Sequence, residues 1–289
     1  MRKKYRILEM RTKRFFNFMF YASLLLVITS CTQWVSTEIT ESKYLKEDSV
    51  LWMQFEIDSE KLSQKYQSGN VSKDSMYKAW DELYQKASKK NVELALKYVT
   101  VPSGLQRMYM VRDDIAKDLL EEKLSILPDS LKDNKYAQYI RKYIDATQVE
   151  AGNLFVPFEC KTPDGKSFDW NTLKGKHFLL VFDGLYCMGK SGRGYLKEML
   201  EKTDRNQFEL IVYLKCRTLE DFKEEAGKFS QFKLISDFHP EGSPMNILYK
   251  CQATPTCFMI DRYGTLQFVS NGVNPEKFDD YLQNNGCKY

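Results

Sequence analysis

Two continuous apolar runs in the second half of the chain constrain its fold most. Residues 177–183 read HFLLVFD, and residues 208–216 read FELIVYLKC. Runs of this length without polar alternation are typical of strands that are buried on both faces. The segment between them, GYLKEMLEKTD, has the spacing of an amphipathic helix. This strand-helix-strand order predicts two neighbouring parallel strands in an α/β domain.

The segments around these runs complete a domain that we expect to span residues 149–289. FVPFECKTPDGKSFDW predicts a hairpin around a Pro-Asp-Gly turn, and RTLEDFKEEAGKF predicts a helix. TPTCFMIDRYGTLQFVS predicts two antiparallel strands, because the turn between them is too short for a crossover. PEKFDDYLQNNG predicts a terminal helix. The expected fold class is α/β, with a mixed central sheet flanked by helices.

Residues 51–148 predict a mainly helical N-terminal region. Apolar side chains recur at spacings of three and four in SMYKAWDELYQKA, DDIAKDLLEEKLSIL and NKYAQYIRKYIDATQ. Aromatic stripes at this spacing are far more often packing surfaces than cofactor sites. We therefore assign no chemistry to this region.

The first thirty residues resemble the signal peptide of a bacterial lipoprotein. A basic lead precedes the apolar stretch FFNFMFYASLLLVI, which is too short and poorly flanked for a stable membrane span. The following ITSC resembles a lipobox, which implies that Cys31 is lipidated. The alternative is an uncleaved N-terminal anchor with an incidental cysteine. Residues 31–50 are polar and lack periodicity, so we expect them to form a tether. Together with the lipobox-like ITSC, this predicts a protein that is anchored to a membrane of the cell envelope.

The charge balance argues against nucleic acid as a partner. Residues 1–30 carry seven of the 43 lysine and arginine residues and one of the 39 acidic residues, so residues 31–289 have a net charge of about −2. The remaining charges of both signs are interspersed, and no basic patch stands out.

The stretch GLYCMGKS, residues 184–191, allows two kinds of site. It matches the phosphate-binding pattern G-x-x-x-x-G-K-S and lies between a strand and a helix. The expected antiparallel hairpin, the short domain and export all argue against a nucleotide. The same stretch puts Cys187 at the start of a helix, where the helix dipole and Lys190 favour a thiolate. We therefore expect a thiol site and no nucleotide.

The order of these elements resembles the thioredoxin fold, and its exported TlpA-like and alkyl hydroperoxide reductase/thiol-specific antioxidant branches in particular. FECKTPDGKSFDWNTLKGKHFLLVF is similar to the family's entry into its central strand. YKCQATPTCFMIDRYGTL is similar to the segment around its cis-proline. The resemblance covers residues 150–289 and implies that Pro255 is the cis-proline, with Thr254 before it.

The active-site match is partial. The family pattern is Trp-Cys-x-x-Cys, whereas this chain has YCMGK at residues 186–190. The first thiol is kept, and lysine replaces the second, which would resolve a mixed disulfide. The peroxiredoxin pattern P-x-x-x-T-x-x-C also fails, since Leu180 and Gly184 hold its Pro and Thr positions.

The resemblance implies an exported thiol-disulfide oxidoreductase or antioxidant without a cofactor. Cys187 would be the nucleophile, Lys190 its electrostatic support, and Thr254 and Pro255 the edge that aligns substrate. Its partners would be protein thiols or disulfides, or a membrane reductant. The alternative is a non-catalytic module on the same fold that binds a protein partner in the cell envelope.

The sequence contains five more cysteines in addition to Cys31 and Cys187. Cys216 ends the strand parallel to the one that leads to Cys187, and parallel neighbours end at the same sheet edge, so it is a possible resolving thiol. Cys251 precedes the proline loop, which family geometry places beside the active turn, and is the second candidate. Cys160 and Cys257 fall within strands and are expected to be small buried hydrophobes, while Cys287 is uninformative. No histidine has metal-ligand spacing with the cysteines, so we expect no metal site.

Overall fold

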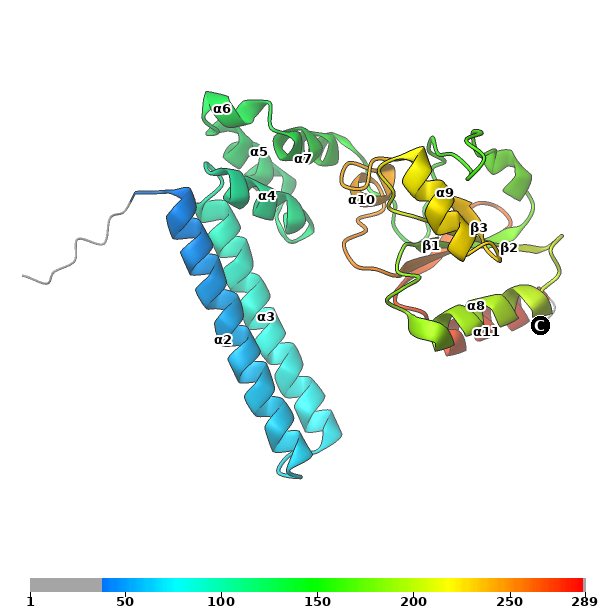
Figure 1. Cartoon of the computed structure of the whole chain (residues 1–289), viewed down its shortest axis with the longest axis horizontal. Coiled ribbons are helices and arrows are strands. Elements are labelled where there is room, and N and C mark those ends of the chain that lie inside the picture. Colours follow the sequence, from blue (N-terminus) through cyan, green and yellow to red (C-terminus); the bar gives the residue numbers. More distant parts are fainter. Residues whose placement is uncertain (1–37, 288–289) are drawn as a thin grey trace, which may run out of the picture. The chain divides into compact units, whose positions relative to one another are not determined.

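The computed structural model describes residues 38–287. The chain divides after Ile39, and every helix and strand described below belongs to the unit Thr40–Tyr289 (Figure 1). The predicted signal peptide, Cys31 and the first part of the predicted tether lie outside the described residues. Between residues 38 and 287, no helix is both long and apolar enough to cross a membrane.

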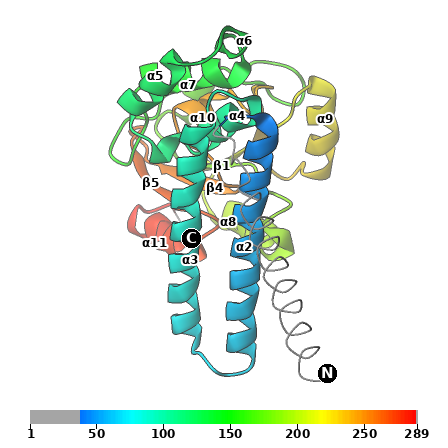
Figure 2. The same ribbon diagram turned by 90° about the vertical axis from the view of Figure 1, so that its left-hand side faces the viewer.

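The N-terminal region is helical, as predicted. Its two longest helices lie side by side in an antiparallel hairpin (Figures 1 and 2), and shorter helices follow. The elements are α2 (Glu41–Gln67), α3 (Lys73–Lys97), α4 (Pro102–Met110), η1 (Arg112–Asp114), α5 (Lys117–Ser125), α6 (Asp129–Lys132) and α7 (Lys135–Asp145). Pro102 occupies the first turn of α4, where its missing N–H costs nothing.

The predicted tether is partly wrong, because α2 begins at Glu41 and includes residues 41–50. Thr40 caps the helix by accepting a hydrogen bond from the backbone N–H of Lys43. Tyr44 is buried edge-on against Tyr98, with ring centroids 5.6 Å apart. The Thr40 cap is local, but the contacts of Tyr44 come from Tyr98 and from Arg107 of α4, more than fifty residues away. The local pattern of residues 31–50 therefore did not reveal them.

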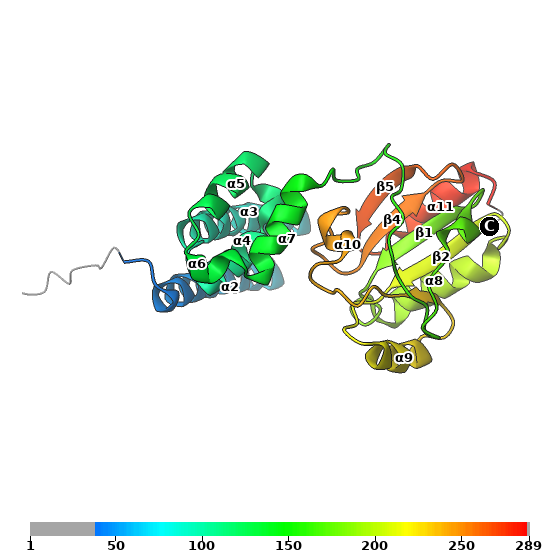
Figure 3. The same cartoon turned by 90° about the horizontal axis from the view of Figure 1, so that it is seen from above.

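The C-terminal domain has a five-stranded mixed sheet, which confirms the predicted fold class. The strand order is β3-β2-β1-β4-β5, and Figure 3 shows β2, β1, β4 and β5 side by side. The predicted parallel pair is β1 and β2, and the predicted antiparallel pair is β4 and β5. A second parallel pair joins β2 to β3, and β4 runs antiparallel to β1. The strands are β1 (His177–Phe182), β2 (Phe208–Tyr213), β3 (Lys233–Ile235), β4 (Thr256–Ile260) and β5 (Leu266–Asn271).

Each face of the sheet has its own apolar core, because alternate residues of β1 point to opposite faces. Leu179 and Val181 belong to a core formed with α8 (Gly189–Lys202), α9 (Leu219–Lys228) and α11 (Pro275–Asn284). Phe178, Leu180 and Phe182 belong to the other core, which is completed by residues 149–173 and α10 (Pro244–Ile247). All six residues of β1 and of β2 are buried, as their apolar runs predicted.

The predicted hairpin at residues 155–170 is only partly formed. Gly165 turns the chain with φ +83°, but pairing is limited to an isolated bridge between Lys161 and Ser167. The backbone of Lys161 also pairs with Ser236. Trp170 donates its indole N–H to the carbonyl of Phe158 at 2.7 Å. Side-chain packing over the sheet, rather than a regular ladder, therefore shapes this segment.

Candidate active site

The turn between β1 and α8 places Cys187 at the surface. The backbone N–H of Asp183 donates to Tyr213 O at 2.8 Å, which extends the β1–β2 pairing by one residue. Asp183 and Gly184 then adopt positive φ angles of 49° and 80° and redirect the chain. The N–H of Met188 bonds Gly184 O at 2.9 Å and closes a helical turn. Cys187 is exposed within this turn, two residues before α8 begins.

Pro255 lies directly against this turn. The Thr254–Pro255 peptide bond is cis, as the resemblance implied. A Cβ atom on Gly184 would lie only 2.5 Å from Pro255 N and 2.7 Å from its Cδ. The approach of the two segments therefore requires glycine at position 184. The carbonyl of Pro255 accepts the N–H of Gly272 at 2.8 Å, so this segment is also held by the end of β5.

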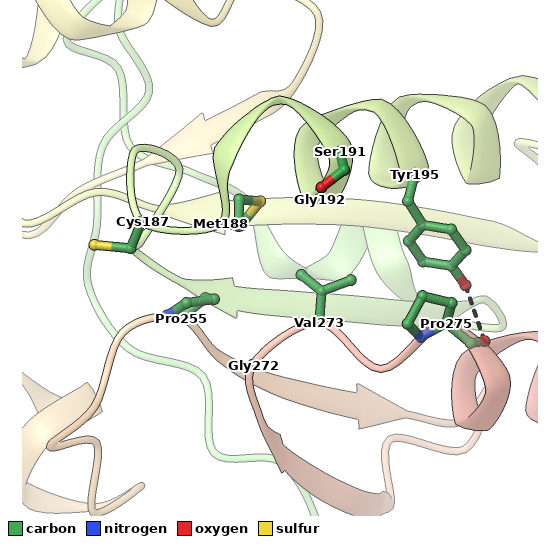
Figure 4. A pocket seen from close by; sticks show the side chains of 9 residues that line it. All are labelled: Cys187, Met188, Ser191, Gly192, Tyr195, Pro255, Gly272, Val273 and Pro275. Carbon is green, nitrogen blue, oxygen red and sulfur yellow. Dashed lines mark hydrogen bonds between the residues drawn. The ribbon is translucent and has the colours of Figure 1, made fainter. Parts of the chain in front are cut away.

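A pocket of about 410 Å³ opens beside Cys187. One wall comes from the start of α8, and the opposite wall comes from Pro255 and the segment between β5 and α11 (Figure 4). The hydroxyl of Tyr195 lies within hydrogen-bond distance of Asp279 Oδ1 and Pro275 O, which ties the two walls together. The lining residues are Cys187, Met188, Ser191, Gly192, Tyr195, Pro255, Gly272, Val273 and Pro275. The lining is mainly apolar, with a thiol at its edge.

The pocket brings together only some of the residues predicted from the sequence. Cys187 and Pro255 line it, and Thr254 is joined to Pro255 by the cis bond. Lys190 lies exposed in the first turn of α8 and does not line the pocket. Neither Cys216 nor Cys251 lines it.

The two candidate resolving thiols are buried on opposite faces of the sheet. Cys216 belongs to the core that also contains Leu185, two residues before Cys187. Its burial, reinforced by Glu225 and Asp183, raises the pKa of the Cys216 thiol to about 11. Cys251 belongs to the other core, and burial raises the pKa of its thiol well above the ordinary value. Residues 38–287 contain six free cysteines, and Cys187 alone among them is exposed.

Cys160 and Cys257 are buried, each within one of the two cores, as expected for small apolar side chains. Burial raises the pKa of both thiols to about 12.

His177 is held between Tyr281 and Arg262, by contacts of 2.8 and 3.2 Å to its two ring nitrogens. Across the described part of the chain, no group of three or more His, Cys, Asp or Glu residues forms a metal-binding cluster.

Polar residues around the turn were missed by sequence reasoning. Burial raises the pKa of the Asp183 carboxyl, opposed by the N–H of Gly184 and the charge of Lys215. Tyr186 donates its hydroxyl to Glu225 at 2.7 Å and packs edge-on against Phe229. Arg193 donates to the carbonyl of Leu185. An acidic residue directly after the apolar run FLLVF was a signal for Asp183, whereas the contacts of Tyr186 and Arg193 depend on tertiary structure.

No protein-family model matches the sequence, and no curated protein resembles it closely enough to count as a match. Solved structures align with about half of the chain. One is a thiol-disulfide oxidoreductase from Bacteroides fragilis, with 15% identity over 47% of this chain and 98% of that one, and a TM-score of 0.40.

Two further solved structures are similar to the same extent. A thiol-disulfide isomerase from Corynebacterium glutamicum has 18% identity over 46% of this chain and 95% of that one, with a TM-score of 0.39. A thiol:disulfide interchange protein from a Bacteroides species has 16% identity over 47% of this chain and 90% of that one, also with a TM-score of 0.39. TM-scores below 0.5 do not identify a fold by themselves. The strand order of the sheet and the contact of the cis-proline Pro255 with Gly184 indicate the thioredoxin-like fold.

Proposed function

We propose that this protein is a thiol-disulfide oxidoreductase of the cell envelope, with Cys187 as its nucleophile. The observation that carries the proposal is the position of Cys187. It is the exposed member of six described cysteines and lines a pocket whose other wall contains the cis-proline. An accessible thiol beside an apolar pocket is suited to a cysteine-containing peptide.

In the proposed reaction the Cys187 thiolate attacks one sulfur of a substrate disulfide. A Cys187–substrate disulfide forms, and the other substrate sulfur leaves as a thiolate. The backbone of Thr254 and Pro255 forms the edge along which the substrate lies, opposite the side chains of α8. Lys190 adds a positive charge near the turn, but its effect is expected to be small because water and salt screen an exposed ammonium.

A second thiol must release the substrate, since lysine cannot perform this step. When Cys216 or Cys251 attacks the mixed disulfide, a protein disulfide forms and the substrate leaves reduced by two electrons. Cys216 is the better candidate, because it shares a core with Leu185 of the active turn. With the pKa of Cys216 at about 11, its thiolate is scarce at neutral pH, so we expect this step to be slow. An external thiol is the other route, and a membrane reductant or a dithiol protein would restore the reduced form.

The second candidate function is a partner-binding module without catalysis. The observation that favours it is Lys190, which stands at the position of the family's resolving cysteine. In that case the pocket beside Cys187 would hold a partner's side chain, and replacement of the thiol would leave binding intact.

We further propose that lipidated Cys31 anchors the protein to a membrane. The basic lead, the apolar stretch and the ITSC sequence support this proposal. Metabolic labelling with a radioactive fatty acid tests it. We expect label in the wild-type protein and none in Cys31→Ala, and label that persists in Cys31→Ala would contradict it.

A disulfide reduction assay on the full chain tests the enzymatic proposal. With a chemical reductant such as dithiothreitol to restore the thiols, the wild type should reduce a peptide disulfide faster than the reductant alone. Cys187→Ser should abolish this acceleration. Cys160→Ala, which removes a buried thiol that does not line the pocket, is the matched control and should retain it. A rate that is unaffected by Cys187→Ser would support the binding module instead.

A further inference from the structure

The segment that leads to Pro255 packs partly against the helical region. Residues 244–252 include α10 and run directly into the loop before β4. Ile247 and Leu248 of this segment pack in the same apolar cluster as Leu105, Met108 and Ile140 of the helical region. The hydroxyl of Tyr109 also donates to the carbonyl of Glu241. The helical region therefore supplies part of the support for the proline loop.

Arg112 forms the first link between the helical region and the segment that leads to Pro255. Its side chain is only 2% exposed and lies 4.2 Å from the ring centroid of Tyr109. The guanidinium donates to the carbonyls of Tyr109 and Asn246. Asn246 in turn donates its side-chain amide to the carbonyl of Cys251 at 2.8 Å. These bonds hold the backbone at Asn246 and Cys251. Arg112 Nε has no hydrogen-bond partner, so the buried cation depends on these carbonyls and on the nearby charge of Asp113.

Asp113 forms the second link and reaches closer to the site. Its Oδ2 accepts the side-chain amide of Gln252 at 2.6 Å, and Gln252 lies three residues before Pro255. The Asp113 side chain is 19% exposed, and Arg112 Nε lies 3.9 Å from its Oδ1. Burial raises the pKa of the Asp113 carboxyl, opposed by the charge of Arg112 and by a hydrogen bond with Tyr143. A bond to a half-buried carboxylate is among the stronger hydrogen bonds in proteins.

The loop residues 253 and 254 lie between two anchored points. Gln252 is held by Asp113, and Pro255 is held by the bond from Gly272 and by its contact with Gly184. Loss of the first anchor loosens the chain between Cys251, which Asn246 still holds, and Ala253, whose carbonyl accepts the hydroxyl of Thr256. The pocket wall opposite Cys187 then becomes less well defined, because Pro255 lines it.

We propose that Asp113 is a positioning residue of the Cys187 site, which acts by holding Gln252 and through it the Thr254–Pro255 edge. The proposal deepens the proposed function and rests on it for the role of the pocket. It gives the helical region a part in substrate alignment. Because an aligning edge contributes mainly to substrate binding, its loss is expected to raise KM more than it lowers kcat.

Hydrogen exchange followed by mass spectrometry tests the link without reference to activity. Asp113→Ala and Gln252→Ala should each increase deuterium uptake in peptides covering residues 249–256, and the double variant should exceed neither single variant. Asp113→Asn keeps an acceptor oxygen and should remain close to wild type. Asp114→Ala, which removes the exposed neighbouring carboxylate, is the matched control.

Steady-state reduction of a peptide disulfide then tests the positioning role. We expect KM to rise about fivefold in Asp113→Ala and in Gln252→Ala, with kcat within about twofold and recovery in Asp113→Asn. Exchange that is unchanged in both alanine variants, or effects that add in the double variant, would overturn the proposal. A wild type without reductase activity would refute the proposed function, and the exchange data would still decide whether Asp113 holds the loop.

Discussion

At the scale of single residues, the site depends on the close approach of Gly184 to Pro255. Position 184 combines a φ of +80° with backbone and ring atoms of Pro255 at less than 3 Å from a would-be Cβ. A side chain there must distort either the turn that carries Cys187 or the proline segment. Glycine at this position is therefore required both by the conformation of the turn and by the packing of the site.

We predict that Gly184→Ala lowers the free energy of unfolding by about 3 kcal/mol, from backbone strain and overpacking together. Gly152→Ala is the matched control, because Gly152 has a φ of +90° but no atom within 4 Å of a would-be Cβ. It should cost about 1 kcal/mol, from the left-handed backbone alone. Urea unfolding measures both, and equal losses in the two variants would contradict the steric account.

At the scale of elements, the helical hairpin is attached to α4 through Arg107. Its guanidinium donates to Asp48 at 2.9 Å and to the Tyr44 hydroxyl at 3.0 Å, both on α2. The side chains of Arg107 and Asp48 are 21% and 18% exposed. An ion pair this well covered, with several hydrogen bonds, contributes more than a surface pair.

Arg107→Ala is expected to lower the free energy of unfolding by about 2 kcal/mol, since Asp48 loses its charged donor in a half-buried setting. Lys132→Ala removes an exposed pair with Asp129 and should leave the urea midpoint unchanged. Hydrogen exchange should locate the effect of Arg107→Ala in residues 44–52. No change in stability or exchange in that variant would show that apolar packing alone holds the hairpin.

The elements that the sequence predicted are those whose pattern is local. The buried strands β1 and β2 follow from their apolar runs, and α7 follows from the spacing of Ile140 and Tyr143. The first turns of α2 escaped prediction because their stabilising contacts come from α3 and α4. The same distinction applies to the site. Cys187 and Pro255 were predicted from motifs, whereas Tyr195 and Val273 meet in the pocket only because the β5–α11 segment reaches α8.

At the scale of the whole molecule, buried thiols make stability fall in alkaline solution. The pKa of Cys216 is raised from 9.0 to about 11, and those of Cys160 and Cys257 to about 12. Below pH 9 these thiols are neutral in both the folded and the unfolded chain. Between pH 9 and about 12 they ionise only when unfolded, so the unfolded state is favoured as pH rises.

We predict that each such thiol adds up to about 1.4 kcal/mol per pH unit to this loss of stability. Urea unfolding of the wild type and of Cys257→Ala, followed from neutral pH to about pH 10.5, measures the contribution of one thiol. The variant should show a shallower decline above pH 9, whatever its stability at neutral pH. Parallel declines in the two proteins would contradict the assigned role of Cys257.

The most direct test of the central claim is to map the mixed disulfides formed when the reduced full chain meets oxidised glutathione. Mass spectrometry should find glutathione on Cys187, and on none of the five buried cysteines between residues 160 and 287. The adduct should accumulate further in Cys216→Ser if Cys216 resolves it. Absence of an adduct on Cys187, under conditions where the unfolded chain reacts at all its thiols, would contradict the assignment of Cys187 as a redox nucleophile.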